Sequence, residues 1–200
     1  MSERHSTLRE QRRADTQRLI QAHAVRLFDE RGYDGATVND VAEAAGVSAM
    51  TVYRHFPTKE DLVLADQNGP LIAELIAATP SELPLVRRIG RALVDSARTL
   101  TAGDDRFLLA RLRLMISTPA LRARHLDNHY VLQQAIVDGL GDETADPDAA
   151  FQAAAAASAC LAAMHTALVQ WAKDDGHTDL PGLIAKALAA AVGNDTPQQS

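Results

Sequence analysis

The residues from Gly46 to Leu62, GVSAMTVYRHFPTKEDL, combine helical spacing with many hydrogen-bonding side chains. Ser48 begins a short helix that ends before Pro57, and its apolar positions, Val52 and Phe56, lie four residues apart on one helical face. The opposite face is left to Ser, Thr, Tyr, Arg and His side chains, which hydrogen-bond anions and the edges of nucleic-acid bases. A helix that only packed against a core would carry apolar residues there, so this face is expected to contact a partner.

The side chains on this face suit two kinds of contact. Small residues at the helix start let the backbone approach base edges, and Met50 and Thr51 can touch a thymine methyl group. Phosphate oxygens accept hydrogen bonds from Tyr, His and Lys, and such contacts fix the register of a protein on DNA without reading its sequence. We therefore expect base contacts from Ser48, Ala49, Met50, Thr51 and Arg54, and phosphate contacts from Tyr53, His55 and Lys59.

Two earlier helices are expected to position this one. Apolar residues recur at helical spacing from Arg12 to Arg31, and a second short helix begins at Thr37, a predicted N-cap with Asp40 as its capping-box acid, and stops at Gly46. A short helix, a tight turn and another short helix match a helix-turn-helix, whose second helix enters the major groove of DNA. The helix start at Thr37 and Val38 also offers backbone N–H groups to phosphates.

The charge is unevenly distributed along the chain. Residues 1–60 hold nine basic and nine acidic side chains, whereas the remainder holds eleven basic and seventeen acidic ones and accounts for the net charge of −6. Residues 1–11 are polar and are expected to form a flexible arm. The arginines at this end are either solvated or contact phosphates and the minor groove, and we count Arg12 and Arg13 as DNA contacts.

The composition narrows the class of protein. A single cysteine, Cys160, excludes an intramolecular disulfide and fits a reducing cytoplasm. The polar start is unlike a secretory signal, and because uninterrupted strongly apolar runs are short, we expect a soluble protein without a membrane span.

The chain after Thr58 is expected to be helical throughout. Thr58 caps a connector helix from about Lys59 to Ala78, with a kink at Gly69–Pro70. Longer helices follow over residues 83–100, 104–117, 120–140, 147–173 and 180–192, separated by Gly, Pro and Asp-rich turns. The predicted fold class is all-α, with a three-helix DNA-binding domain over 12–58, a larger helical domain over 59–192 and a disordered tail over 193–200.

The segment TVNDVAEAAGVSAMTVYRHFPTKEDL resembles the DNA-binding signature of the tetracycline-repressor (TetR) family along its whole length. The turn glycine Gly46, the Tyr53–Phe56 pair and the Pro57–Lys59 start of the next helix all match, and RLIQAHAVRLFDERGYDGATV resembles the family's first helix and linker. The resemblance covers about residues 12–65. It implies a homodimeric regulator, usually a repressor, that leaves its palindromic operator when a small molecule binds the C-terminal domain. The family pairs its last two long helices at the dimer interface.

The segment from Arg111 to Leu140 is similar to a subgroup whose C-terminal domain binds acyl-CoA-like ligands, which implies an elongated apolar or acyl-type effector. Each apolar residue in this region could equally fill a core. The arginines on these helices could bind an anionic ligand end or form surface ion pairs; they are Arg106, Arg111, Arg113, Arg122 and Arg124. The predicted effector pocket comprises Phe107, Arg111, Met115, His129 and Met164.

Other chemistries find little support in the sequence. His125 and His129 have a spacing that can hold a metal ion, but a third ligand is not evident, so we expect neither metal nor cofactor. The sequence has no GxSxG, HExxH or P-loop pattern, and we expect no enzymatic activity. The alternatives are a transcriptional activator, a small-molecule-binding helical protein without DNA binding, and an enzyme on a helical scaffold.

Overall fold

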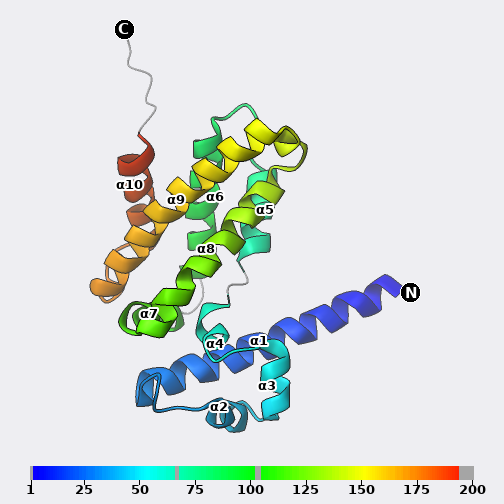
Figure 1. Ribbon diagram of the computed structural model, residues 1–200, viewed down its shortest axis with the longest axis vertical. Helices are drawn as coiled ribbons and strands as arrows, with labels where there is room; N and C mark the ends of the chain where they lie inside the picture. Colours follow the sequence, from blue (N-terminus) through cyan, green and yellow to red (C-terminus); the bar gives the residue numbers. More distant parts are fainter. Residues whose placement is uncertain (1, 66–67, 102–104, 194–200) are drawn as a thin grey trace. The chain divides into compact units, whose positions relative to one another are not determined.

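The computed structural model describes residues 2–65, 68–101 and 105–193, except for the side chains of residues 2–8, 10 and 125–128. Within these ranges every regular element is helical, as predicted (Figure 1). The elements are α1 (Ser2–Arg31), α2 (Val38–Ala44), α3 (Ala49–His55), α4 (Asp61–Leu64), α5 (Gly69–Ala77), α6 (Leu85–Thr101), α7 (Asp105–Ser117), α8 (Pro119–Gly139), the 3₁₀ helix η1 (Gly141–Thr144), α9 (Pro147–Lys173) and α10 (Leu180–Val192).

The chain divides into two compact units. Unit 1 comprises Met1–Ala65 together with Arg113–Arg124, and unit 2 comprises Asp66–Leu112 and His125–Ser200. The end of α7 and the start of α8 therefore belong to the same unit as α1–α4, although the sequence placed both helices in the C-terminal domain. The predicted tail lies, apart from Gly193, outside the described residues.

Unit 1 is built on α1. This helix begins at Ser2, ten residues before the expected start at Arg12, so residues 2–11 are helical where the sequence suggested an arm. Its buried face carries Ile20, Val25 and Phe28. The link to α2 is tight at Gly35, because a Cβ atom there would lie 2.3 Å from the carbonyl oxygen of Arg31.

The predicted connector helix is wrong, because the structure has two short helices in its place. Thr58 and Asp61 exchange the expected capping bonds, Thr58 N to Asp61 Oδ2 at 2.9 Å and Asp61 N to Thr58 Oγ1 at 3.3 Å. The helix then ends after Leu64, since Ala65 has left helical geometry with ψ at 113°. Pro70 stands in the first turn of α5, where a missing N–H costs nothing, so it starts a helix and does not kink one.

Unit 2 is a bundle in which α6 packs against α5, α9 and α10, and α9 packs against α10. The turn from α9 to α10 is closed by Trp171, which is buried and whose Nε1 donates to the carbonyl oxygen of Thr178 at 2.8 Å. Helix α8 approaches α5 closely at Gly139, where a Cβ atom would lie 2.8 Å from Ala73 Cα. The bounds of α9 and α10 are those predicted from the turn residues around them.

Candidate nucleic-acid interface

The turn between α2 and α3 depends on Gly46. Its φ of +66° lies in the left-handed region that glycine adopts without steric cost. This conformation lets Gly46 N donate to Glu43 O at 3.1 Å and Val47 N donate to Ala42 O at 3.0 Å, which ends α2. The chain can then start α3 only two residues later, as a helix-turn-helix requires.

Helix α3 is fixed by its inward face and by its cap. Val52 and Phe56 are 0% and 1% exposed, as the spacing predicted. Ser48 is the N-cap, and its Oγ accepts from Thr51 N at 3.1 Å. The Ser48 and Thr51 hydroxyls also hydrogen-bond each other at 2.9 Å, and both side chains stay accessible to solvent.

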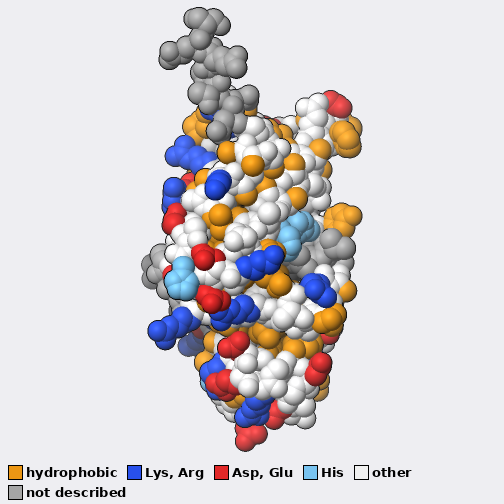
Figure 2. All heavy atoms as spheres, turned by 90° about the vertical axis from the view of Figure 1, so that its left-hand side faces the viewer, with side chains coloured by type: hydrophobic (Ala, Val, Ile, Leu, Met, Phe, Trp, Pro, Cys, Tyr) orange, Lys and Arg blue, Asp and Glu red, His pale blue; other side chains and the backbone are white. Residues whose placement is uncertain are grey.

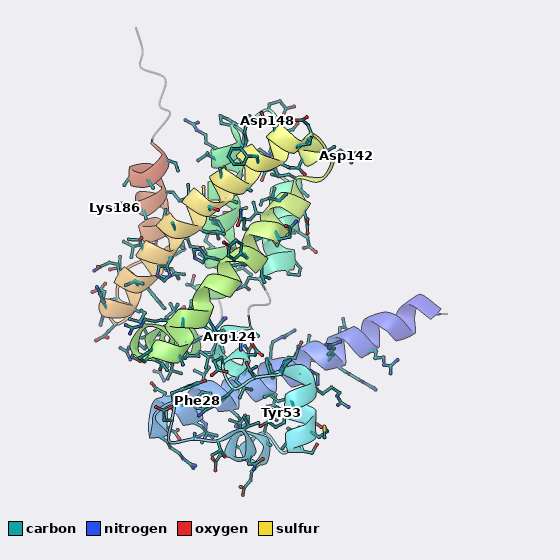
Figure 3. All side chains as sticks on the ribbon, viewed as in Figure 1. Phe28, Tyr53, Arg124, Asp142, Asp148 and Lys186 are labelled. Carbon is teal, nitrogen blue, oxygen red and sulfur yellow. The ribbon has the colours of Figure 1, made fainter. Side chains whose placement is uncertain are left out.

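The outward face of α3 carries the side chains predicted to contact DNA. Met50 and Tyr53 are 77% and 48% exposed, which is unusual for large apolar groups. Arg54 is exposed, and Ala49 and His55 are half-buried. Tyr53 is labelled in Figure 3, where it lies on α3. This face therefore has no packing role within the described part of unit 1.

The start of α2 has the predicted capping box. Thr37 N donates to Asp40 Oδ2 at 2.7 Å, and Asp40 N donates to Thr37 Oγ1 at 3.2 Å. The hydrogen bonds from Thr37 lower the pKa of Asp40, and Arg31 contributes to the shift. Thr37 is exposed and Val38 is half-buried, so both stand at an accessible helix start.

Two arginines, one on α1 and one on α3, act on a histidine of α3. Burial lowers the pKa of His55, and the positive charges of Arg54 and Arg13 lower it further. Arg13 comes from α1, so a residue far from α3 in the sequence contributes to its electrostatic environment. Arg12 and Arg13 are both exposed. Three cationic or protonatable groups on one edge of α3 form a favourable environment for a phosphate.

Lys59 has partners inside unit 1 that the sequence did not suggest. Its Nζ donates to the carbonyl oxygen of Tyr33 at 2.5 Å and lies 4.4 Å from the ring centroid of Tyr33 and 5.2 Å from that of Phe28. An ammonium group has three donors. Its contact with phosphate stays a prediction, and the structure adds a second role, holding the start of α4 against the α1–α2 link.

Two further residues position this unit, and sequence reasoning missed them. Gln21 is 6% exposed, and its Nε2 donates to the carbonyl oxygen of Ala65 at 2.9 Å, tying the end of α4 to α1. Arg124 on α8 donates from Nη1 to Thr58 Oγ1 at 3.0 Å. A glutamine on the apolar face of α1 was a visible signal for the first contact. Nothing local in the sequence pairs Arg124 with Thr58.

Unit 2 holds four of the five residues predicted to line an effector pocket, and the fifth, Met115, belongs to unit 1. All five side chains are half-buried, on α7, α8 and α9. The structure brings His129 against His165, with ring centroids 6.0 Å apart in an edge-on arrangement. Burial lowers the pKa of both rings, and His165 also acts on His129. The side chain of His125 lies outside the described residues. Among the described side chains, no cluster of three or more metal-binding groups occurs.

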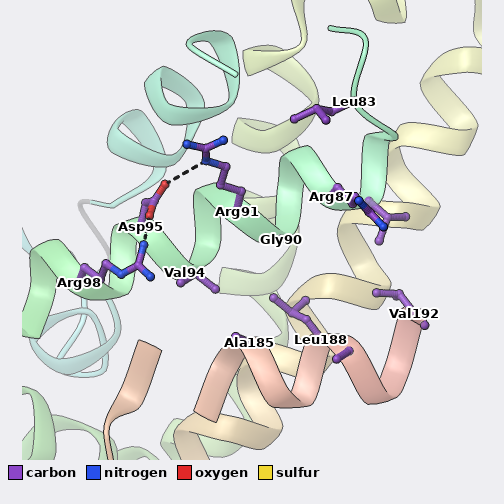
Figure 4. A pocket seen from close by; sticks show the side chains of 13 residues that line it. Leu83, Arg87, Gly90, Arg91, Val94, Asp95, Arg98, Ala185, Leu188 and Val192 are labelled. Atoms are coloured by element: carbon purple, nitrogen blue, oxygen red, sulfur yellow. Dashed lines mark hydrogen bonds and ion pairs between the residues drawn. The ribbon is translucent and has the colours of Figure 1, made fainter. Parts of the chain in front are cut away.

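A groove of about 530 Å³ lies elsewhere in unit 2, between α6 and α10 (Figure 4). Its apolar floor is flanked by arginines of α6, one of which, Arg98, donates to Asp95 at 2.5 Å. None of the five predicted pocket residues lines it. Its lining residues are Leu83, Val86, Arg87, Gly90, Arg91, Val94, Asp95, Arg98, Ala185, Leu188, Ala189, Val192 and Gly193.

The outer surface of α9 is rich in small uncharged residues. From Phe151, which is 71% exposed, an exposed stripe continues along the helix through alanine, serine and threonine side chains. The upper part of the face in Figure 2, over α9 and α10, is dominated by hydrophobic and uncharged groups. Helix α9 is also the one described helix long and apolar enough to cross a membrane, a weak indication because core helices of soluble proteins pass the same test. The sequence analysis did not foresee that it would pass.

Comparison with protein families gives two matches. Residues 20–65 match the bacterial regulatory proteins of the tetR family, and residues 83–193, more than half of the chain, match the MftR C-terminal domain. The first match covers α2, α3 and α4 together with most of α1.

Curated relatives agree with these matches. The chain is 32% identical over 120 residues to the HTH-type transcriptional repressor AcnR of Corynebacterium glutamicum, an alignment that spans 56% of this chain and 57% of that protein. It is 24% identical over 182 residues, 90% of this chain and 89% of the relative, to a Mycobacterium tuberculosis protein named as the mycofactocin biosynthesis regulator MftR.

Solved structures show the same fold. The fatty acid degradation regulator FadR from Bacillus halodurans has a TM-score of 0.61 at 20% identity, covering 90% of this chain and 96% of that one. FadR from Thermus thermophilus in complex with lauroyl-CoA has a TM-score of 0.56 at 19% identity, covering 92% and 97%.

Proposed function

We propose, because this chain belongs to the tetR family of bacterial regulatory proteins, that it is a transcriptional repressor that binds operator DNA through α3. The observation that carries the proposal is the outward face of α3. Val52 and Phe56 anchor the helix from inside, while Met50, Tyr53 and Arg54 extend into solvent. Such a helix is held rigidly and presents its polar side, which is what insertion into a major groove requires.

The contacts on DNA divide into two groups. Ser48, Ala49, Met50, Thr51 and Arg54 read base edges, and Arg54 is the side chain suited to bidentate contact with guanine. Phosphates are bound by Arg12, Arg13, Thr37, Val38, Tyr53, His55 and Lys59, with the α2 start contributing backbone N–H groups. The arginine and histidine side chains that meet at α3 favour this side of unit 1 for the phosphate backbone.

A homodimer is required to bind a palindromic operator. We assign its interface to the exposed faces of α9 and α10, where small residues such as Ala155 and Ala162 allow close helix approach. The uncharged stripe that begins at Phe151 supports this assignment. Two α3 helices in such a dimer read half-sites separated by about one DNA turn, roughly 34–36 Å, or by a larger multiple.

The effector is proposed to be an elongated acyl compound, such as an acyl-CoA ester. Solved relatives of the same fold are described in complex with stearoyl-CoA and lauroyl-CoA. The pocket proposed for it contains Phe107, Arg111, His129 and Met164, whose half-buried side chains lie in unit 2. The fifth predicted residue, Met115, belongs to unit 1. Arg111 would meet an anionic part of the ligand and the others its chain. A ligand of this kind lowers DNA affinity only if it binds the DNA-free conformation more tightly.

The remaining parts of the proposal follow from the family. A repressor works in the cytoplasm, needs no membrane, metal or cofactor, and catalyses no reaction. One alternative to repression is that the same DNA-binding unit activates transcription. The other alternative is that the protein binds a small molecule and does not bind DNA.

The test is binding of the dimer to its own upstream DNA, measured by fluorescence anisotropy from 50 to 200 mM salt. Arg54→Ala should weaken binding at least about fivefold, because a good base contact contributes about 1–3 kcal/mol. Tyr53→Ala should weaken binding to every sequence, and Arg13→Ala should in addition flatten the salt dependence, because a lost cationic contact with phosphate releases one counterion fewer. Arg26→Ala is the matched control, since Arg26 is exposed on α1 and pairs with Glu30 at 3.0 Å. Absence of binding by the unaltered protein at low salt would refute the proposal.

The effector part has a separate readout. Lauroyl-CoA or stearoyl-CoA should bind the protein directly, as followed by calorimetry, and should raise the Kd for DNA. Phe107→Ala should weaken acyl-CoA binding while leaving DNA binding unchanged. Normal DNA binding with no response to either ester would keep the repressor and discard the acyl effector.

A further inference from the structure

The tip formed by the end of α7 and the start of α8 is an integral part of unit 1. Residues Arg113–Arg124 belong to the same compact unit as residues 1–65, and within them Leu114 and Leu121 are 6% and 0% exposed. From Arg124 the same helix continues without interruption to Gly139, and this later stretch belongs to unit 2. Helix α8 therefore contributes its first turns to unit 1 and its remainder to unit 2.

Arg124 lies where the first turns of α8 meet the start of α4 (Figure 3). Its Nη1 donates to Thr58 Oγ1 at 3.0 Å and lies 3.9 Å from Glu60 Oε2, and its Nη2 lies 3.7 Å from Asp61 Oδ1. The side chains of Arg124, Glu60 and Asp61 are 42%, 26% and 24% exposed, so the ion pairs are only partly screened by solvent. The guanidinium of Arg124 thus contacts three polar side chains within four residues at the α4 start.

These three groups themselves hold the DNA-binding unit together. Thr58 and Asp61 form the reciprocal capping bonds that start α4. Between them, Lys59 reaches the carbonyl oxygen of Tyr33 in the link from α1 to α2. Burial raises the pKa of Tyr33, the negative charge of Glu60 raises it further, and the positive charge of Arg124 acts in the opposite direction, so Tyr33, Glu60 and Arg124 influence one another electrostatically. Displacing Arg124 therefore disturbs the cap of α4 and the link to α2 together.

The helices around the two places where the chain passes from one unit to the other differ in length. Helix α4 has only four residues, and α5 begins anew at Gly69 with Pro70 in its first turn. Helix α8 has 21 residues, and its hydrogen-bonded backbone belongs to both units.

We propose that Arg124 transmits effector binding in unit 2 to the DNA-binding unit, by moving with α8 and altering the Thr58–Asp61 cap. The inference rests on the proposed repressor function and adds the residue that carries its regulation. Arg124 touches neither DNA nor effector; it is a positioning residue. Removing it should leave both ligands bound and reduce the influence of one on the other, since coupling between two sites is a free energy separate from either affinity.

The first experiment compares Arg124→Ala with Arg122→Ala, an exposed arginine two residues earlier on α8. The Kd for operator DNA is measured with and without saturating lauroyl-CoA, and acyl-CoA binding is measured directly. In Arg124→Ala the factor by which lauroyl-CoA weakens DNA binding should fall at least fivefold, within the usual range of such coupling. Arg122→Ala should keep the full factor, and Arg124→Lys should restore part of it. An unchanged factor in Arg124→Ala, with DNA and acyl-CoA bound normally, would overturn the proposal.

A second experiment does not need an effector. Gly139→Ala forces α8 away from α5 inside unit 2, because the added Cβ would lie 2.8 Å from Ala73 Cα. Its effect on DNA affinity should be at least fivefold smaller in the Arg124→Ala background than in the wild-type background. Equal effects in both backgrounds would overturn the proposal, whatever the effector proves to be.

A milder change guards against loss of the fold. If Gly139→Ala unfolds unit 2, which the fluorescence of Trp171 reports, Ala135→Val replaces it in the same cycle. Ala135 faces α5 at Gly69, where a Cβ atom would lie 3.4 Å from its own. Failure of lauroyl-CoA to act on the unaltered protein would count against the acyl effector alone, and the two-variant cycle would still decide the role of Arg124.

Discussion

Replacing Gly46 isolates the backbone cost of the turn before α3. At this position a Cβ atom would meet nothing within 4 Å, while φ is +66°, so Gly46→Ala adds left-handed strain and no collision. That strain costs about 1–2 kcal/mol for a residue with a Cβ atom, and a few tenths are recovered because alanine has less freedom when unfolded. We expect a net destabilisation of unit 1 of about 1 kcal/mol, or roughly 4–8 °C in Tm for a unit of this size.

Two neighbouring substitutions bracket this value. Gly46→Asn should cost only a few tenths of a kcal/mol, because asparagine tolerates the left-handed region. Gly35→Ala should cost more, about 2–3 kcal/mol, because its Cβ atom would lie 2.3 Å from the carbonyl oxygen of Arg31 and the backbone must shift.

The sequence provides a way to separate the two units in the assay. The single tryptophan, Trp171, lies in unit 2, so its fluorescence follows that unit alone, whereas far-ultraviolet circular dichroism follows both. The Gly46 variants should shift the circular dichroism transition and leave the fluorescence transition in place. A Gly46→Ala protein as stable as wild type, or less stable than Gly35→Ala, would refute the account of the turn.

Three further predictions concern unit 2. The hydrogen bonds from Arg88 lower the pKa of Glu143, so the ionised carboxylate stabilises unit 2 above its unfolded value near 4.5 and this contribution is lost as the pH falls; urea titrations should show Glu143→Gln less stable than wild type at pH 7, with the two converging near pH 3. Burial raises the pKa of Cys160 to about 11, so its reaction with a disulfide reagent at pH 8 should be at least about a hundredfold slower than in the urea-unfolded chain; equal rates would contradict the buried site. Trp171→Phe removes the bond to Thr178 O and should cost about 1 kcal/mol in a denaturant titration read by circular dichroism.

Features set by short-range chemistry were predictable from the sequence. The cap at Thr37 was identified because a side-chain oxygen and a backbone N–H three residues on meet at a helix start. Ser48 was identified as the beginning of the next helix, and the structure shows that it is the N-cap. Val52 and Phe56 were identified as anchors from their spacing. The family resemblance extended this reading to DNA binding, and the tetR match over residues 20–65 agrees with it.

The break between α4 and α5 and the contacts of Arg124 could not be predicted from short-range sequence patterns. Thr58 and Asp61 predict the start of a helix. The sequence does not predict that the helix ends before Ala65, because alanine favours helices and the end is set by contacts with other parts of the fold. Arg124 and Thr58 are 66 residues apart, and a lone arginine on a helix carries no sign of its partner. The same limit applies to Lys59, whose bond to Tyr33 O spans 26 residues.

On α3, the residues that stabilise the helix differ from those proposed to recognise DNA. Val52, Phe56 and the Ser48 cap hold the helix, whereas Met50 and Arg54 project from it. Surface positions of this kind usually change stability by less than about 0.5 kcal/mol when substituted. In the proposed function, where Met50 and Arg54 read base edges, variants of this protein can therefore acquire new operator sequences one residue at a time without passing through unfolded intermediates. Variants that each bind their own operator, and do not bind one another's, should be obtainable from this single scaffold.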